Sequence, residues 1–292
     1  MALLLLCVAV NAFIGVIFKF FDRYKVNVLP AVVINYFVCV LTSMVLTQSF
    51  TVNQATFASS YFLPALILGV LFVSIFVTVG HTYAQFGIVV TTIFHKMSLL
   101  APTLVAVLVF GERMGWMKAI GILLAISAIL FMTGIWEKKE GSDLPKFSIK
   151  AWILPIVTLL GSCLIDTGLY LVEALQLAQS GDIRFVATLF FCAGCMGSIF
   201  ILYKVSTSGI EWNTKDILAG IGLGIPNFFS IYLLLLLLSK GWDGSVVFPI
   251  NNVGILAFSA FIGFIFFKEK ITLLRIGGVV LSIIAILMIA NG

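Results

Sequence analysis

Unbroken apolar runs follow one another along this chain from Ala2 to Ala290. Each run holds about 20 residues, which as a helix rises about 30 Å and crosses the hydrocarbon core of a bilayer. In lipid the backbone must pair its own polar groups, either in helices or in a closed barrel. A barrel would need short segments that alternate apolar and polar residues, and the runs do not alternate. The runs therefore predict an all-α integral membrane protein with several spans.

The charged residues agree with this class and set its limits. The chain is 62% hydrophobic and only 10% charged, where soluble chains carry about 25% charged residues. Its mean hydropathy is +1.20. The net charge of +5 comes from lysines and arginines that mostly lie between the runs, where such residues set orientation and meet lipid headgroups. We therefore expect a multi-pass protein of the cell membrane (inner or plasma membrane), with no nucleic-acid partner.

Ten spans can be placed, and a charged linker divides them into two groups of five. The linker is 137–150, and it separates a first five-helix repeat (1–136) from a second (151–292). No basic segment precedes the first apolar run, so we expect it to be the first span rather than a cleavable signal peptide. A short turn at 84–87 separates the third span from the fourth. The predicted spans are 2–21, 29–47, 61–83, 88–110, 117–136, 151–172, 185–203, 217–238, 246–267 and 273–290.

The two groups of spans are copies of one another. Residues 87–130 align without a gap on 244–287, at an offset of 157, which places Glu112 on Glu269 and Gly121 on Gly278. A weaker alignment, at an offset of 154, places 36–37 on 190–191. Five is an odd number of spans, so the second copy enters the membrane from the opposite side. The predicted fold is an inverted 5+5 repeat, which places a binding site near the midplane between the halves and supports alternating access.

With its duplicated five-span unit, the acidic residue after the fourth and ninth spans, and the glycines Gly121 and Gly278, the chain resembles the drug/metabolite transporter superfamily in its ten-helix, EamA-like form. The region of Pro102 adds to the resemblance. The resemblance implies a central cavity lined mainly by spans one, three, four, six, eight and nine. It also implies that Glu112 and Glu269 are structural hinge residues rather than substrate ligands. Pro102 and Pro249 are further predicted hinge positions. The family moves amino acids, nucleotide sugars, drugs and other metabolites, so the resemblance leaves the substrate open.

Polar side chains deep in apolar spans are the candidate site. An ionisable group at that depth is costly and indicates function with a partner. On the fourth span Thr91, His95, Ser98 and Pro102 recur at i, i+4, i+7 and i+11, which places them on one helix face. Lys96 lies beside this stripe. Interhelical hydrogen bonding is the alternative role for the stripe, and snorkelling to a headgroup is the alternative for Lys96.

The second repeat supplies the other half of the candidate site. The repeat places Asn252 where His95 stands, beside Asn251, and Asp166 lies mid-span in the sixth span. Asp166 is too short to snorkel, so Lys96 is its first candidate partner. The predicted substrate-binding residues are Lys96, His95, Asp166, Asn252, Asn251, Thr91 and Ser98.

Catalytic patterns are missing from the sequence. It has no Ser-His-Asp arrangement, no phosphate loop and no His/Cys/Asp cluster at metal-ligand spacing. Cys192 and Cys195 lie inside a span, where packing of small residues is favoured over metal or redox use. We therefore expect no enzyme and no cofactor.

The predicted function is secondary or facilitated transport of a small polar metabolite, amino-acid-like or other. A lysine, a histidine and amides would suit a carboxylate or a phosphate. An integral membrane enzyme or flippase acting on a lipid or prenyl-phosphate, and a non-transporting subunit, remain alternatives. Proton coupling through Asp166 or His95 stays open beside uncoupled exchange. The expected partners are the bilayer and the substrate, and monomer and homodimer are both open.

Ten spans place both termini on one side of the membrane, but two arguments disagree on which side. The loops after odd-numbered spans carry eleven basic residues, namely Arg23, Lys25, Lys138, Lys139, Lys146, Lys150, Lys204, Lys215, Lys268, Lys270 and Arg275. The other loops carry four, namely Arg113, Lys118, Arg184 and Lys240. This excess predicts that the odd loops face the cytoplasm, whereas the family resemblance implies cytoplasmic termini.

Overall fold

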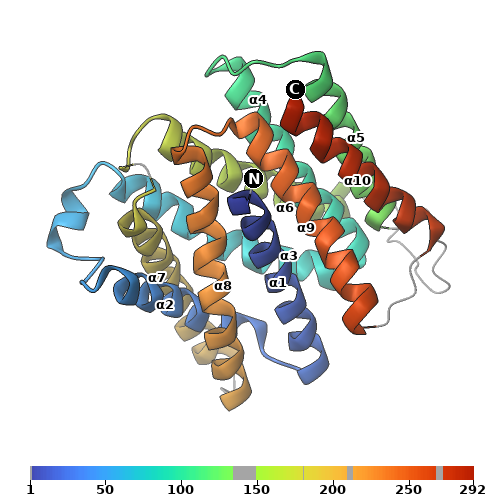
Figure 1. Ribbon diagram of the computed structural model, residues 1–292. Coiled ribbons are helices and arrows are strands. Elements are labelled where there is room, and N and C mark those ends of the chain that lie inside the picture. The colour runs from blue at the N-terminus through green and yellow to red at the C-terminus, as the bar shows by residue number, and fades with distance from the viewer. Residues whose placement is uncertain (1, 134–148, 180, 209–212, 268–271) are drawn as a thin grey trace. The chain divides into compact units, whose positions relative to one another are not determined.

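The computed structural model describes residues 2–133, 149–179, 181–208, 213–267 and 272–292, and these residues form helices and no strand (Figure 1). The α-helices of the described part are α1 (Ala2–Tyr24), α2 (Val28–Thr47), α3 (Phe62–Lys96), α4 (Leu100–Leu108), α5 (Trp116–Thr133), α6 (Ile149–Ala174), α7 (Ile183–Ser208), α8 (Thr214–Ser239), α9 (Gly244–Phe267) and α10 (Leu273–Asn291). Two short 3₁₀ helices, η1 (Gln54–Ala58) and η2 (Met97–Leu99), complete them.

Helix length and surface identify a membrane protein. Six helical segments in the described residues are long and apolar enough to cross a bilayer, and four shorter apolar helices accompany them. Large apolar side chains also lie on the outside: Val45, Leu108 and Leu273 are 76%, 77% and 86% exposed. A soluble protein rarely exposes so much apolar surface. The predicted all-α membrane class is therefore confirmed.

Two compact units divide the chain, and each takes helices from both sequence repeats. The first unit comprises Met1–Ser74 and Gly168–Gly241, and the second comprises Ile75–Thr167 and Trp242–Gly292. The unit boundaries fall inside α3, inside α6 and between α8 and α9. The predicted domain bounds follow the sequence repeats rather than compactness, so they stay a prediction. Most of the linker lies outside the described residues.

In the first unit α2 packs against α7 and α8. Gly224 of α8 lies so close to α2 that a Cβ there would stand 3.0 Å from the Asn35 carbonyl oxygen and against Val38. In the same way, a Cβ at Gly69 of α3 would stand 3.0 Å from the Leu189 carbonyl oxygen and against Cys192 on α7. These four α2 and α7 positions pair at the offset of 154, because 35 maps to 189 and 38 maps to 192. The two contacts are therefore counterparts.

An aromatic contact in the first unit obeys the same offset. Tyr36 of α2 stacks on Phe190 of α7, with ring centroids 5.9 Å apart, and 190 is 36 plus 154. A residue that contacts its own repeat equivalent is what a local two-fold relation between α2 and α7 would give.

In the second unit α5 packs along α10, and the two helices run antiparallel (Figure 1). A Cβ at Gly121 would stand 3.1 Å from the Ile289 backbone nitrogen, and a Cβ at Gly278 would stand 2.8 Å from that of Met132. The offset of 157 converts one contact into the other, since 121 maps to 278 and 132 maps to 289. Glycine is needed at both positions because the two backbones approach too closely for a side chain.

The predicted turn at 84–87 does not interrupt the helical backbone, because α3 continues through it to Lys96. The interruption comes later, where η2 separates α3 from α4. Pro102 explains the position: a proline lacks the N–H that would bond the carbonyl of Ser98, and its ring clashes with that carbonyl. Gly87 alone is a weak breaker, costing about 1 kcal/mol relative to alanine.

Candidate functional site: a polar cluster where α3 ends

The end of α3 brings three polar side chains to one place in the second unit. His95 and Lys96 close the helix, and Ser98 lies in the 3₁₀ turn η2. A stretch of 3₁₀ helix between two α-helices often marks a functional hinge. His95 and Lys96 are half-buried, and Ser98 is 1% exposed.

Asp166 of α6 is bound by this turn. The Ser98 hydroxyl donates to its Oδ2 at 2.6 Å. Such a short O–H···O⁻ distance is typical of a charge-assisted hydrogen bond. Asp166 is half-buried.

Lys96 contacts α9 rather than Asp166. Its Nζ donates to Asn252 Oδ1 at 3.3 Å, and Asn252 is held in turn by donation from its Nδ2 to the Phe248 carbonyl at 3.2 Å. Lys96 and Asp166 lie close enough for their charges to interact. Although both side chains are described, no direct ion pair joins them. The predicted partners therefore do not touch: Asp166 accepts from Ser98, and Lys96 donates to Asn252.

His95 pairs with a residue that the sequence did not single out. Its Nδ1 lies 2.8 Å from the hydroxyl of Ser162 on α6, a side chain that is 2% exposed. Asn252, the repeat equivalent of His95, contacts the neighbouring Lys96. Ser162 stands four residues before Asp166, so the one-face spacing of α6 could have revealed it.

One turn of α6 touches two distant parts of α3, which shows how the site is assembled. Ile75 packs on Gly161, whereas His95 pairs with the adjacent Ser162. A straight helix would carry residues 75 and 95 about 30 Å apart. The axis of α3 must therefore bend between them, and this bend returns His95 to α6. Thr82, bonded to Thr158 at 2.9 Å, belongs to the earlier limb.

The remaining predicted ligands, Thr91 and Asn251, are buried, and both lie close in sequence to residues of this cluster. Thr91 is 0% and Asn251 is 8% exposed, and both interact with other groups in the structure.

Glu112 lies at the start of α9. Its two carboxylate oxygens accept from the backbone N–H groups of Gly244 and Ser245, each at 2.9 Å. These N–H groups are among those that a helix leaves unpaired at its first turn. The cap starts α9 at Gly244, so Pro249 lies in the second turn of this helix. A span that began at 246 would have placed Pro249 in the first turn. Pro249 and Pro102 are both buried. Glu269 lies outside the described residues.

A second group of charges, which the sequence did not reveal, stands next to this cap. Lys118 is only 3% exposed. Its Nζ lies 3.2 Å from Asp243 Oδ2 and donates to the Arg113 carbonyl at 2.9 Å and to Ser245 Oγ at 3.3 Å. The sequence placed Lys118 in a loop as an orientation signal, whereas here it fastens the start of α5 to the start of α9.

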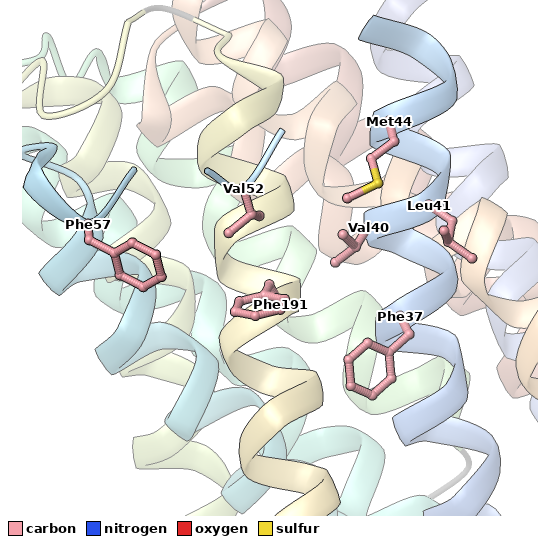
Figure 2. A pocket seen from close by; sticks show the side chains of 7 residues that line it. All are labelled: Phe37, Val40, Leu41, Met44, Val52, Phe57 and Phe191. Carbon is pink, nitrogen blue, oxygen red and sulfur yellow. The ribbon is translucent and has the colours of Figure 1, made fainter. Parts of the chain in front are cut away.

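An apolar groove of about 400 Å³ lies in the first unit. Figure 2 shows side chains of α2 along one of its sides and Phe57 and Phe191 along another. Its lining is Phe37, Val40, Leu41, Met44, Val52, Phe57 and Phe191. This groove offers no polar side chain, so it cannot orient a polar metabolite.

The described part of the chain contains no candidate metal site and no disulfide. No group of three or more His, Cys, Asp or Glu side chains there could hold a metal ion. All five cysteines are free, and each is buried or half-buried in a helix.

Comparisons with known proteins add a fold and no activity. No family model matches the chain. An uncharacterized protein of Haemophilus influenzae is 29% identical over 228 residues, which cover 76% of this chain and 72% of that protein. A solved protein crystal structure superposes with a TM-score of 0.75 at 11% identity and covers 98% of both chains. That likeness concerns the fold alone.

Proposed function

We propose that the chain is a secondary transporter or facilitator that moves a small polar metabolite across the cell membrane by alternating access between its two repeats. The observation that carries the proposal is the polar cluster of Lys96, Asn252, Ser98 and Asp166, inside apolar helices of the second unit. A charge in such a helix costs about 3 kcal/mol on insertion scales. Two unpaired but neighbouring charges therefore favour a water-filled or substrate-filled site over a structural role.

The helix contacts support the inverted repeat that alternating access uses. Helices α5 and α10 are antiparallel, and their contacts exchange under the repeat offset, through Gly121 with Ile289 and Gly278 with Met132. Equivalent helices that lie antiparallel are expected only when one copy is inverted. The six long and four shorter apolar helices also agree in number with the ten proposed spans.

The proposed family is the drug/metabolite transporter superfamily, in its EamA-like form. The sequence resemblance carries this assignment. The position of Glu112 on the backbone N–H groups that start α9 supports the hinge role that the resemblance implies. Coupling to protons through Asp166 or His95 and uncoupled exchange are both compatible with the cluster.

A metabolite-uptake screen in proteoliposomes tests the proposal. Vesicles with the parent protein should accumulate or exchange at least one labelled polar metabolite above protein-free vesicles. Asp166→Asn should reduce that uptake, whereas Asp182→Asn, which lies outside the cluster, should not. Scrambling of a labelled lipid or prenyl-phosphate by the parent protein, without metabolite uptake, would instead support the flippase or enzyme alternative.

A further inference from the structure

We infer that Lys96 anchors a substrate through a carboxylate group, and that the site takes a monoanion in preference to a phosphate dianion. This inference rests on the proposed function, since it takes the polar cluster as the substrate site. It names the chemical class that the transport proposal leaves open.

The first argument is that Lys96 has N–H donors without an acceptor in the described part of the chain. An ammonium group has three N–H donors and no acceptor. In the described part of the chain, Lys96 Nζ makes a single hydrogen bond, to Asn252 Oδ1, and at 3.3 Å it is longer than usual for a charged donor. Two donors are therefore available to an acceptor that enters the half-buried cluster.

The position of Asp166 is the second step, because it decides which anion is accepted. Asp166 is held by Ser98 at 2.6 Å, so it does not take up the free donors of Lys96. With both groups ionised the pair is neutral. A bound monoanion then brings the cluster to one negative charge, and a dianion brings it to two. Repulsion is weakly screened among apolar helices, so the second charge is disfavoured.

Neutral groups around Lys96 suit the second oxygen of a carboxylate. Asn252 is fixed on α9 by its bond to the Phe248 carbonyl, and the His95–Ser162 pair stands next to Lys96 in the chain. Such fixed neutral groups orient a bound anion without adding charge.

The test is binding to the purified parent protein in detergent, measured by thermal unfolding and by equilibrium dialysis. The probes are propionate, lactate, benzoate and alanine, each against its uncharged amide or, for alanine, its methyl ester. Inorganic phosphate, at a pH well above its second ionisation, is the dianion. Sodium chloride matches ionic strength throughout. At least one carboxylate should raise the unfolding temperature in a concentration-dependent way, and its counterpart without the carboxylate should not. Alanine separates a zwitterionic substrate from a simple monocarboxylate.

Lysine variants assign the effect to one residue. Lys96→Met should weaken carboxylate binding about thirtyfold, the loss expected for a charge-assisted hydrogen bond. Lys96→Arg should retain binding within about fivefold, which covers the case in which the methionine variant does not fold. Lys240→Met removes an exposed lysine at the end of α8 and should bind like the parent.

The inference is overturned if the amides stabilise as well as the acids, if no carboxylate binds, if phosphate binds more tightly than every carboxylate, or if both Lys96 variants respond like the parent. Its failure differs from failure of the proposed function. Uptake of only uncharged or cationic metabolites would remove the carboxylate anchor and keep the transporter. Carboxylate binding without any uptake would support the carboxylate anchor and contradict the transport function.

Discussion

Single buried polar residues in this protein are held by several donors at once, and Asp216 is the strongest case. It is 0% exposed and accepts from the Asn27 backbone N–H at 2.8 Å, from Asn27 Nδ2 at 3.1 Å and from the Asn213 backbone N–H at 3.2 Å. It thereby caps α8 and fastens the α1–α2 connection to it.

Asp216→Ala should destabilise the protein by about 2 kcal/mol, because α8 loses its cap and three donors lose their acceptor at a partly buried contact. Thermal unfolding in detergent measures the loss. Asp182→Asn is the control, because the half-buried Asp182 side chain accepts a single described backbone bond, from Arg184 at 2.9 Å. A loss no larger than that of the control would show that Asp216 is not a structural clip.

In the polar cluster, a double-mutant cycle separates contact from proximity. The Ser98–Asp166 bond should give a coupling energy of about 2 kcal/mol, as hydrogen bonds to charged groups do. The Lys96–Asp166 pair, which does not touch, should give less than about 1 kcal/mol. The cycles use Ser98→Ala, Lys96→Met and Asp166→Asn in chemical denaturation. A larger coupling energy for Lys96–Asp166 than for Ser98–Asp166 would show that Lys96 and Asp166 form a direct ion pair.

Close helix pairs give predictions at the scale of elements, and the chain provides a matched control next to the test position. A Cβ at Gly278 of α10 would meet the backbone and side chain of Met132, whereas a Cβ at Gly277 would meet nothing within 4 Å. Gly278→Ala should cost about 1–3 kcal/mol through overpacking. Gly277→Ala should be neutral or slightly stabilising, because alanine favours helix over glycine.

The reciprocal contact sharpens this test. Gly121→Ala should cost nearly as much as Gly278→Ala, since the two glycines occupy equivalent places between α5 and α10. Thermal unfolding of the three variants decides the matter. Equal effects at Gly277 and Gly278 would mean that α5 and α10 do not pack as described.

At this scale the sequence predicted the helices better than their interruptions. Every α-helix of the described part overlaps a predicted apolar run. Gly220 and Gly224 pack α8 closely on α2. The break after Lys96 was placed too early, since its cause, Pro102, acts on the turn before it. Ser162 and the pairing of Lys118 with Asp243 were missed for a different reason. Periodicity ranks residues on one helix, but it does not say which residues of another helix will lie opposite.

At the scale of the whole molecule, the length of α3 bears on how many times the chain crosses the membrane. As one unbroken helix of 35 residues, α3 would measure about 50 Å when straight, far beyond the roughly 30 Å of a hydrocarbon core. Its two limbs both contact the turn of α6 at Gly161 and Ser162. We expect a helix that bends back in this way to cross the bilayer once with its first limb and to return through its second limb and α4.

Ten crossings then predict that the loop after α2 and the loop after α4 face the same side. Ser49→Cys and Met114→Cys are suitable reporters because both positions are exposed, and the native cysteines are buried or half-buried. In intact cells a membrane-impermeant maleimide should label either both variants or neither of them. Gln179→Cys should give the same result as these two. Lys25→Cys and Ser206→Cys should label from the opposite side. If α3 and α4 together made a single crossing, Met114 and Gln179 would label opposite to Ser49. The same experiment decides between the two orientations, since cytoplasmic odd loops would protect Lys25→Cys and Ser206→Cys in intact cells.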